Sequence, residues 1–155
     1  MEAEGLSTAA IQAFESTFNA LASGETGMIP ESTITPVPDL VDASAIECEP
    51  NADLLSETVV LKLNGGLGTS MGLDKAKSLL EVKDGMTFLD MTAKQVQYMK
   101  KELGNVKFML MNSFSTSEDT MTFFKEKYPE LAAEEGLEMV QNKIPKIDVE
   151  TFQVK

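Results

Sequence analysis

Apolar residues follow two different patterns in the second half of the chain. Three short stretches are apolar almost throughout, as in strands of a buried sheet: TVVLKLN at 58–64, VKFMLM at 106–111 and LEMVQN at 137–142. Residues 88–103 and 117–128 instead carry apolar side chains at helical spacing. This alternation of strand, helix, strand, helix and strand predicts an α/β fold with a parallel sheet and right-handed crossovers.

Capping residues mark the ends of the two predicted helices. Thr87-Phe88-Leu89-Asp90 matches a capping box, and Gly104 is placed to end the helix that follows. We expect one face of this helix to carry Phe88, Thr92, Gln95, Val96, Met99 and Leu103. The second helix is expected to begin within residues 113–118 and to stop at Pro129. Its packed face should carry Met121, Phe124 and Tyr128.

The first 56 residues differ from the rest in charge and in residue composition. They contain ten acidic residues and no lysine, whereas all thirteen lysines lie in residues 57–155. Residues 6–22 predict one amphipathic helix, capped by Ser7, with Ala10, Phe14, Phe18 and Leu21 at helical spacing. The stretch 24–56 is rich in Pro, Gly, Ser, Thr and acids, and predicts an extended surface tether. We therefore predict a division into 1–56 and 57–155.

Composition removes several classes of chemistry. The net charge is −12, which repels nucleic acid, and the chain contains neither histidine nor arginine. Ser-His-Asp systems, Cys-His nucleophiles and imidazole-held zinc therefore cannot be built from this chain alone. Cys48 is the only cysteine, so no internal disulfide can form. With no bilayer-length apolar run and an acidic start unlike a secretory or mitochondrial signal, we expect a cytoplasmic protein without a membrane partner.

A glycine-rich segment directly follows the first predicted strand. In LNGGLGTSMG, residues 63–72, four glycines fall within eight positions. We expect them to adopt positive φ angles and to let backbone amides converge on phosphate oxygens. The carboxyl end of a strand is also where an α/β fold places its ligand. Position and composition predict phosphate binding, and the alternative is a tight turn without a ligand.

Two common phosphate-binding loops fit this segment poorly. No glycine is followed at the required spacing by Gly-Lys, which excludes a P-loop. Gly66, Gly68 and Gly72 place the third glycine of a dinucleotide fingerprint one residue late. Asp84 could serve as the ribose acid of that fingerprint, but the segment after the loop leaves little room for the long helix it requires. A nicotinamide dinucleotide is therefore a weak alternative.

The order of motifs around this loop closely resembles the N-terminal part of the UDP-glucose pyrophosphorylase family, the UTP:glucose-1-phosphate uridylyltransferases. The matching segments are VVLKLNGGLGTSMG, then KSLLEV, GMTFLD and FMLMNSF, and the resemblance covers roughly residues 24–147. It implies a Rossmann-like sugar nucleotidyltransferase core, a parallel or mixed sheet flanked by helices, with residues 57–155 as the first part of the catalytic domain. Three strands are few for a sheet, so we expect this core to be incomplete.

The resemblance also implies a nucleotide site around the loop. It makes Lys77 the catalytic residue, directed toward the triphosphate, and places the loop backbone against the nucleotide. Gln141 would read the uracil edge, because an amide offers one donor and one acceptor; Met111 would pack near the base, although a strand methionine can equally fill a core. The implied substrate-binding residues are Leu63, Gly65, Gly66, Gly68, Lys77, Met111 and Gln141. Relatives often show Gly-Pro-Lys-Ser where this chain has KAKS at 75–78, which leaves the division of roles between Lys75 and Lys77 open.

The implied reaction is the reversible formation of UDP-glucose and pyrophosphate from UTP and glucose 1-phosphate. It depends on positioning and charge neutralisation more than on a base, so it is compatible with a chain that lacks histidine. Mg²⁺ is the implied cofactor, with ligands outside this chain; Asp74, Asp84 and Asp90 are predicted to be turn and cap residues. We expect these 155 residues to be inactive alone. The alternative is a noncatalytic nucleotide-binding or regulatory module with the same loop; sugar specificity and oligomeric state stay open.

Overall fold

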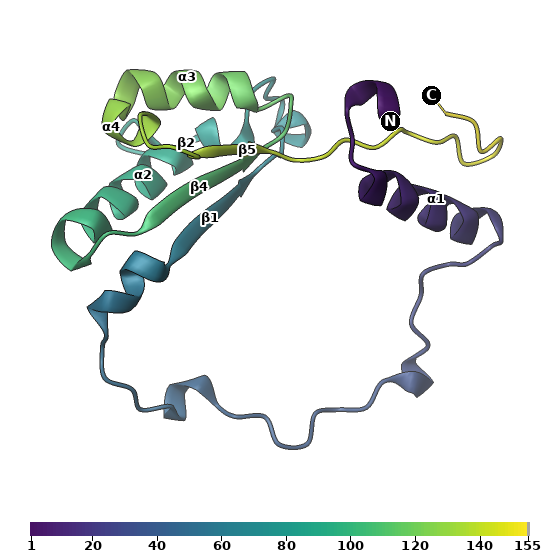
Figure 1. Cartoon of the computed structure of the whole chain (residues 1–155), viewed down its shortest axis with the longest axis horizontal. Helices are drawn as coiled ribbons and strands as arrows, with labels where there is room; N and C mark the ends of the chain where they lie inside the picture. Colours follow the sequence, from purple (N-terminus) through teal and green to yellow (C-terminus); the bar gives the residue numbers. More distant parts are fainter. Residues whose placement is uncertain (155) are drawn as a thin grey trace. The chain divides into compact units, whose positions relative to one another are not determined.

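The computed structural model describes residues 1–154 and contains two compact units (Figure 1). One unit is Pro50–Gln141, which holds strands β1 to β5. The other combines Met1–Glu49 with Asn142–Lys155. The chain thus leaves the N-terminal unit near residue 50 and returns to it after Gln141. The division into 1–56 and 57–155, which was drawn from charge, does not contain this return.

A three-stranded parallel sheet forms the centre of the unit Pro50–Gln141. Its strands are β1 (Val59–Asn64), β4 (Lys107–Asn112) and β5 (Glu138–Val140), in the order β1-β4-β5 (Figure 1). The register pairs Leu63 with Met111 and Asn64 with Asn112, so the carboxyl ends of β1 and β4 lie level. The predicted parallel α/β core is confirmed.

The helices between these strands begin where the sequence predicts. Helix α2 spans Phe88–Tyr98 and continues as a π-helical turn over Met99–Leu103; α3 spans Ser117–Lys127, and α4, Pro129–Ala132, starts at the proline. The capping box is present, because Asp90 N donates to Thr87 Oγ1 at 3.1 Å and Thr87 N donates to Asp90 Oδ2 at 2.8 Å. Asp90 is thus a cap residue, as predicted.

The predicted packed face of α2 is confirmed for Val96, which is buried, and for Met99, which packs against the core, but it is wrong for Phe88 and Gln95. Phe88 is 46% exposed and Gln95 is exposed, whereas Leu89 and Ala93, which were not predicted, are buried. The spacing 89, 93, 96 is as helical as the predicted one, so periodicity alone could not decide between them. The prediction for α3 holds better, since Phe124 and Tyr128 are buried and Met121 packs against the core.

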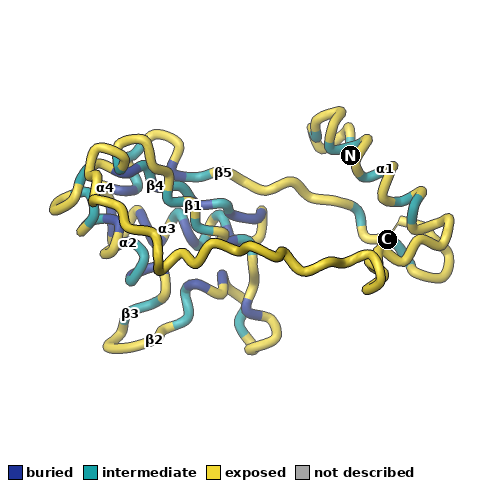
Figure 2. The backbone as a smooth tube through the Cα atoms, turned by 90° about the horizontal axis from the view of Figure 1, so that it is seen from below, coloured by how far each residue is buried: buried dark blue, intermediate teal, exposed yellow. Residues whose placement is uncertain are grey.

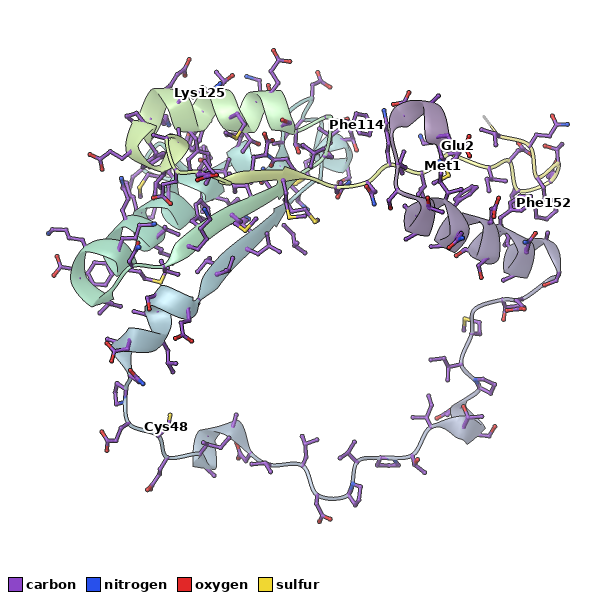
Figure 3. The ribbon with its side chains drawn as sticks, in the orientation of Figure 1. Met1, Glu2, Cys48, Phe114, Lys125 and Phe152 are labelled. Carbon is purple, nitrogen blue, oxygen red and sulfur yellow. The ribbon has the colours of Figure 1, made fainter. Side chains whose placement is uncertain are left out.

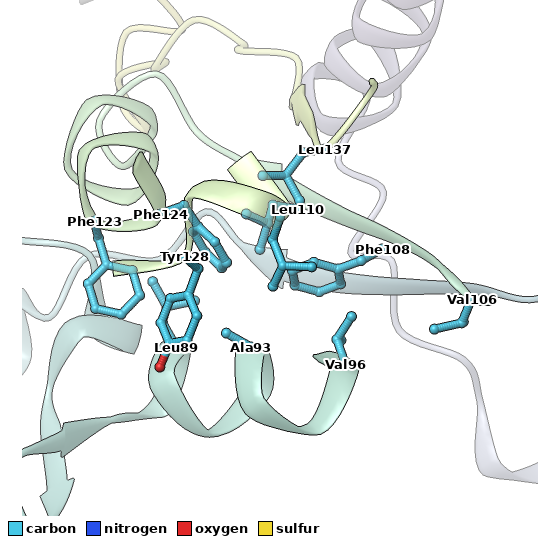
Figure 4. Close-up of a cluster of buried hydrophobic side chains, with 11 residues drawn as sticks. Leu89, Ala93, Val96, Val106, Phe108, Leu110, Phe123, Phe124, Tyr128 and Leu137 are labelled. Atoms are coloured by element: carbon cyan, nitrogen blue, oxygen red, sulfur yellow. The ribbon is translucent and has the colours of Figure 1, made fainter. Parts of the chain in front are cut away.

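One face of the sheet is covered and the other is not. Helices α2 and α3 both pack on the face that presents Phe108 and Leu110, which are fully buried (Figure 4). On the opposite face of β1, Leu61 and Leu63 are 46% and 67% exposed. Parallel sheets usually carry helices on both faces, so this apolar face is unusual in being open.

A two-stranded antiparallel hairpin, which the sequence analysis did not predict, precedes α2. It pairs β2 (Glu81–Lys83) with β3 (Met86–Thr87). Asp84 and Gly85 form its turn with φ angles of 54° and 71°, as a two-residue Asp-Gly hairpin turn requires. Asp84 is therefore a turn residue, as predicted.

In the other unit, α1 (Thr8–Ala22) packs against the segment after Asn142. Ser7 caps α1 by accepting from the amide of Ala10 at 3.3 Å. Phe18 meets Phe152, which is labelled in Figure 3, edge to face with ring centres 6.4 Å apart. Between α1 and β1 the chain has only short 3₁₀ turns and is exposed almost throughout (Figure 2). Three such turns lie between α1 and β1, Glu31–Thr33, Ala43–Ala45 and Ala52–Glu57, and a fourth, Glu2–Glu4, precedes α1. None of the helices within residues 1–154 is long and apolar enough to cross a lipid bilayer.

Candidate functional site

The glycine-rich segment doubles back on itself after β1. Leu67 bridges Ala76 in antiparallel fashion, and the amide of Gly68 donates to the carbonyl of Lys75 at 3.3 Å. The amide of Lys77 donates to the carbonyl of Gly66 at 3.0 Å. Two short 3₁₀ turns, Thr69–Met71 and Lys77–Leu79, complete the loop. Lys77 is therefore brought back beside the start of the loop, although eleven positions separate it from Gly66.

The glycines of this loop are needed for different reasons. Only Gly72 adopts a positive φ angle, 71°, so the expectation of positive φ is wrong for Gly65, Gly66 and Gly68. A Cβ on Gly65 would lie 2.7 Å from Gln141 Oε1, and one on Gly68 would lie 2.7 Å from Leu73 Cβ. A Cβ on Gly66 would meet nothing within 4 Å. Close approach explains Gly68, a Cβ on Gly65 would require the end of the exposed Gln141 side chain to shift, and the space above Gly66 is open for a ligand.

Gln141 follows β5 directly and lies over the beginning of the loop. Its backbone amide donates to the carbonyl of Asn112 at 2.7 Å, which fixes it at the carboxyl end of β4. Its side-chain amide lies against Gly65, and the residue is exposed. An exposed amide held at the ends of two strands can present a donor and an acceptor to the edge of a flat ring.

Lys77 lines a hollow of about 240 Å³ beside the loop. The other lining residues are Lys62, Leu63, Asn64, Gly66, Ser78 and Phe88. Among the described residues, neither Lys62 nor Lys77 has a carboxylate within ion-pair distance. Two positive charges without internal partners thus lie at one small hollow, where an anionic ligand could neutralise them.

Lys75 lines a different hollow from Lys77. Glu118, Asp119, Glu126 and Lys127 also line that hollow, so it holds three carboxylates and two ammonium groups, that of Lys75 included. The residue between the two lysines, Ala76, is fully buried, and the lysines themselves are exposed. The structure therefore separates the two lysines and leaves Lys77 as the one beside the loop glycines.

Leu63 and Met111 are neighbours at the carboxyl ends of β1 and β4. They are paired in register on the open face of the sheet, and Met111 is also paired with Met139 of β5. Leu63 is exposed and Met111 is half-buried. Both side chains can therefore form an apolar surface for a ligand, which a fully buried core methionine could not.

Six of the seven predicted binding residues thus gather at the carboxyl ends of the parallel strands. They are Leu63, Gly65, Gly66, Lys77, Met111 and Gln141. Gly68 is buried, and its amide is already bonded to Lys75, so the fold of the loop is enough to explain it. Not every amide of the loop is available to an anion, since those of Met71 and Leu73 donate to the Gly68 carbonyl.

A buried polar network that sequence reasoning missed lies beneath these residues. Asn64 Nδ2 donates to Asn112 Oδ1 at 2.7 Å and to Thr120 Oγ1 at 2.9 Å, and Asn64 Oδ1 accepts from Ser78 Oγ. Asn112 Nδ2 donates to Glu138 Oε1 at 2.7 Å. We call Asn64, Ser78, Asn112, Thr120 and Glu138 the strand-end network. Its signal in the sequence is that both VVLKLN and FMLMN end an apolar strand with asparagine.

The described residues offer no evident metal site. No group of three or more Asp, Glu, Cys or His side chains within residues 1–154 is arranged to hold an ion. Asp84 and Asp90 serve the hairpin turn and the helix cap, and Asp74 lies at an exposed bend of the loop. That Mg²⁺ binds to residues outside this chain stays a prediction.

Comparison with known proteins gives matches along almost the whole chain. The family model described as UTP–glucose-1-phosphate uridylyltransferase matches residues 11–154. The uridylyltransferase of that name from Astragalus penduliflorus is 46% identical over 102 residues, which cover 65% of this chain and 20% of that protein.

Solved structures match at a similar identity. A mutant UDP-glucose pyrophosphorylase from Leishmania major, in complex with UDP-glucose, is similar with a TM-score of 0.89 and 46% identity, over 100% of this chain and 33% of that one. A protein from Trypanosoma brucei, described as UDP-glucose phosphorylase, gives a TM-score of 0.86 at 47% identity, over 98% and 33% of the two chains. The chain thus spans about a fifth of the curated relative and about a third of the solved ones.

Proposed function

The chain belongs to the UTP–glucose-1-phosphate uridylyltransferase family, and from this premise we propose that it forms the UTP-binding part of an enzyme that makes UDP-glucose. In the proposed reaction, a phosphate oxygen of glucose 1-phosphate attacks the α-phosphorus of UTP. A new P–O bond forms, the bond between the α-phosphorus and the bridging oxygen breaks, and pyrophosphate leaves. The same steps run in reverse from UDP-glucose and pyrophosphate.

In this proposal the uracil ring lies at the carboxyl ends of β4 and β5. The Gln141 amide bonds the pairing edge of the base, because its donor and acceptor complement those of uracil. Leu63 and Met111, paired at the open face of the sheet, supply apolar contact to the ring. The support for this placement is that Gln141 lies against Gly65, at the start of the loop.

The phosphates lie over Gly66 and reach Lys77. Open space above Gly66 allows close approach to the backbone, and Lys77 lines the same hollow without a carboxylate partner among residues 1–154. Its ammonium group would neutralise charge that develops on the departing pyrophosphate. Mg²⁺ remains a proposed cofactor of the complete enzyme, and no step is assigned to it here, because the described residues offer no acidic cluster for it.

The observation that carries the proposal is the convergence of Gln141, Gly66 and Lys77 at the ends of the parallel strands. Calorimetry with the 155-residue chain tests it directly. We expect UTP to bind and CTP to bind more weakly, and Gln141→Ala to remove this preference. Failure to bind UTP, or tighter binding of a nicotinamide dinucleotide, would overturn the proposal. A preference that survives Gln141→Ala would assign base recognition to backbone groups instead.

A second measurement separates the enzyme from a noncatalytic nucleotide-binding module. Both would bind UTP, but only the enzyme releases pyrophosphate when glucose 1-phosphate is added. Because the chain covers a third or less of the relatives compared above, we expect binding by the 155 residues alone and release only with the remainder of the catalytic domain. We also propose a cytoplasmic setting, which suits a chain whose only cysteine is a free, exposed thiol.

A further inference from the structure

Two buried asparagines connect the phosphate side of the candidate site with its base side. We propose that Asn64 is a positioning residue that sets Lys77 and Gln141 at the correct separation for one nucleotide. This inference rests on the proposed function, since it concerns how the same site is held. Asn64 and Asn112 are 4% and 0% exposed. Asn64 lines the hollow beside the loop, but its side-chain nitrogen and oxygen are both bonded to other residues of the strand-end network, so its role is to hold neighbours rather than to bind the ligand.

On the phosphate side, Asn64 holds the residue that follows Lys77. Ser78 is 9% exposed, and its hydroxyl donates to Asn64 Oδ1. On the other side of the same peptide segment, the Lys77 amide donates to the Gly66 carbonyl at 3.0 Å. The backbone of Lys77 is thus fixed from two directions, and one of them is Asn64.

On the base side, Asn64 acts through Asn112. The Asn64 amide donates to Asn112 Oδ1 at 2.7 Å, and Asn112 Nδ2 donates to Glu138 of β5 at 2.7 Å. The carbonyl of Asn112 accepts the backbone amide of Gln141 at 2.7 Å. A shift of Asn112 therefore moves the anchor of Gln141, while a shift of Asn64 moves the anchors of both ligand-binding residues.

The hydrogen bonds leave Asn64 a single orientation. Its oxygen accepts from Ser78, and its amide nitrogen donates to both Asn112 and Thr120. A flipped amide would turn its donors toward Ser78 and its acceptor toward the Asn112 oxygen, and would break the network. No buried side-chain nitrogen or oxygen within the described residues lacks a partner, so no spare contact is available to compensate.

The test measures affinity ratios rather than affinities. A variant that is merely less folded weakens the binding of every nucleotide by the same factor, so its ratios do not change. Calorimetry on the 155-residue chain with UTP, CTP and UMP gives two ratios: UTP to UMP reports the phosphate side, and UTP to CTP reports the base side. Tyr128→Phe is the matched control, because it removes a buried 2.8 Å hydrogen bond to Asp90 outside the strand-end network.

Each variant has a distinct expected result. Asn64→Ala should lower both affinity ratios by about two- to tenfold. This range corresponds to the loss of one hydrogen bond between protein and ligand on each side of the site. Ser78→Ala should lower only the UTP to UMP ratio, and Glu138→Ala, at a half-buried position, only the UTP to CTP ratio. Tyr128→Phe should change neither.

The outcomes separate this inference from the proposed function. If the unmodified chain binds no UTP, the proposed function itself is overturned. If the unmodified chain discriminates among the nucleotides and folded Asn64→Ala keeps both ratios, the positioning role is wrong. Should Asn64→Ala fail to fold, unchanged ratios in both Ser78→Ala and Glu138→Ala would overturn the inference equally.

Discussion

At the scale of single residues, the loop glycines are not interchangeable. Gly65 leaves room for the Gln141 amide, Gly68 leaves room for Leu73, and Gly72 takes a left-handed conformation. Gly66 alone faces empty space without a special backbone angle. Neither a close neighbour nor a positive φ angle explains the glycine at position 66. We therefore expect a ligand to use the space above it.

Substitution of Gly66 should therefore separate binding from stability. We expect the free energy of unfolding of Gly66→Ala to lie within about 0.5 kcal/mol of the value for the unmodified chain, because the added Cβ meets no neighbour. UTP affinity should nevertheless fall, since the methyl group occupies the ligand's approach. Urea denaturation and calorimetry on the same samples measure both. Gly65→Ala is the comparison: it should displace Gln141 and reduce the preference for UTP over CTP.

The two lysines of the loop should differ in effect. Lys77→Ala should weaken UTP binding by roughly tenfold or more, because a hydrogen bond to a charged group contributes about 1.5–3 kcal/mol. Lys75→Ala should change the affinity little, since Lys75 lies beside Glu118, Asp119 and Glu126. Titration calorimetry at one fixed ionic strength compares them. Equal losses for both variants would contradict the proposal that only Lys77 binds the phosphates.

Order along the chain was informative about where some candidate residues lie. Met111 and Gln141 lie at the carboxyl ends of β4 and β5, where the strand order places them, whereas Lys77 reaches the same edge because the loop returns to Gly66. Asn64 and Asn112 were missed because an asparagine after a strand usually indicates a turn. Only the register, which pairs the two residues across β1 and β4, shows that their amides meet.

At the scale of elements, a buried carboxylate joins two helices. Asp90 caps α2 and accepts from the Tyr128 hydroxyl, at the end of α3, at 2.8 Å. Burial alone would raise the pKa of Asp90, but hydrogen bonds from Thr87 and Tyr128 and the charge of Lys127 outweigh it and lower the pKa. Burial, with the bond to Asp90, raises the pKa of Tyr128 to about 12.

These shifts predict how stability depends on pH. A carboxyl group whose pKa is lower in the folded state stabilises the fold above its unfolded pKa of about 3.9, and this contribution is lost as pH falls through the folded pKa. In Asp90→Asn, the free energy of unfolding should therefore fall less steeply below pH 4 than in the unmodified chain. Urea denaturation between pH 2 and 7 would show it; parallel acid limbs would contradict the assignment.

Element boundaries were predicted better than element faces. Caps and prolines act locally, so Thr87, Ser7 and Pro129 could be read from the sequence alone. The packed face of α2 depends on which of two neighbouring helical stripes meets β4, which is a tertiary choice. The β2–β3 hairpin was missed because its strands are very short, although the Asp84-Gly85 pair was an available signal.

At the scale of the whole chain, the open face of the sheet should tolerate changes that the covered face does not. Leu110→Ala should lower the free energy of unfolding by about 2–5 kcal/mol, since Leu110 is fully buried beneath the helices. Leu61 lies on the other face and is 46% exposed, so Leu61→Ala should lower the free energy of unfolding by less than about 1 kcal/mol. Urea denaturation of this matched pair measures the difference. Equal costs would mean that the face carrying Leu61 is covered in solution.

The candidate site carries local positive charge within a chain whose net charge is negative. The net charge of −12 opposes the approach of a nucleotide triphosphate, yet Lys62 and Lys77 share one hollow beside the loop. The proposed binding of a highly charged anion would therefore depend on a few local groups rather than on the overall field.

A nuclear magnetic resonance titration of the labelled 155-residue chain with UTP tests this most directly. Amide signals of Gly65, Gly66, Lys77 and Gln141 and the methyl signal of Met111 should shift together and saturate at one UTP concentration. Unchanged signals at these residues, or shifts confined to α1 and residues 142–154, would contradict a uridine nucleotide site at the ends of the parallel strands.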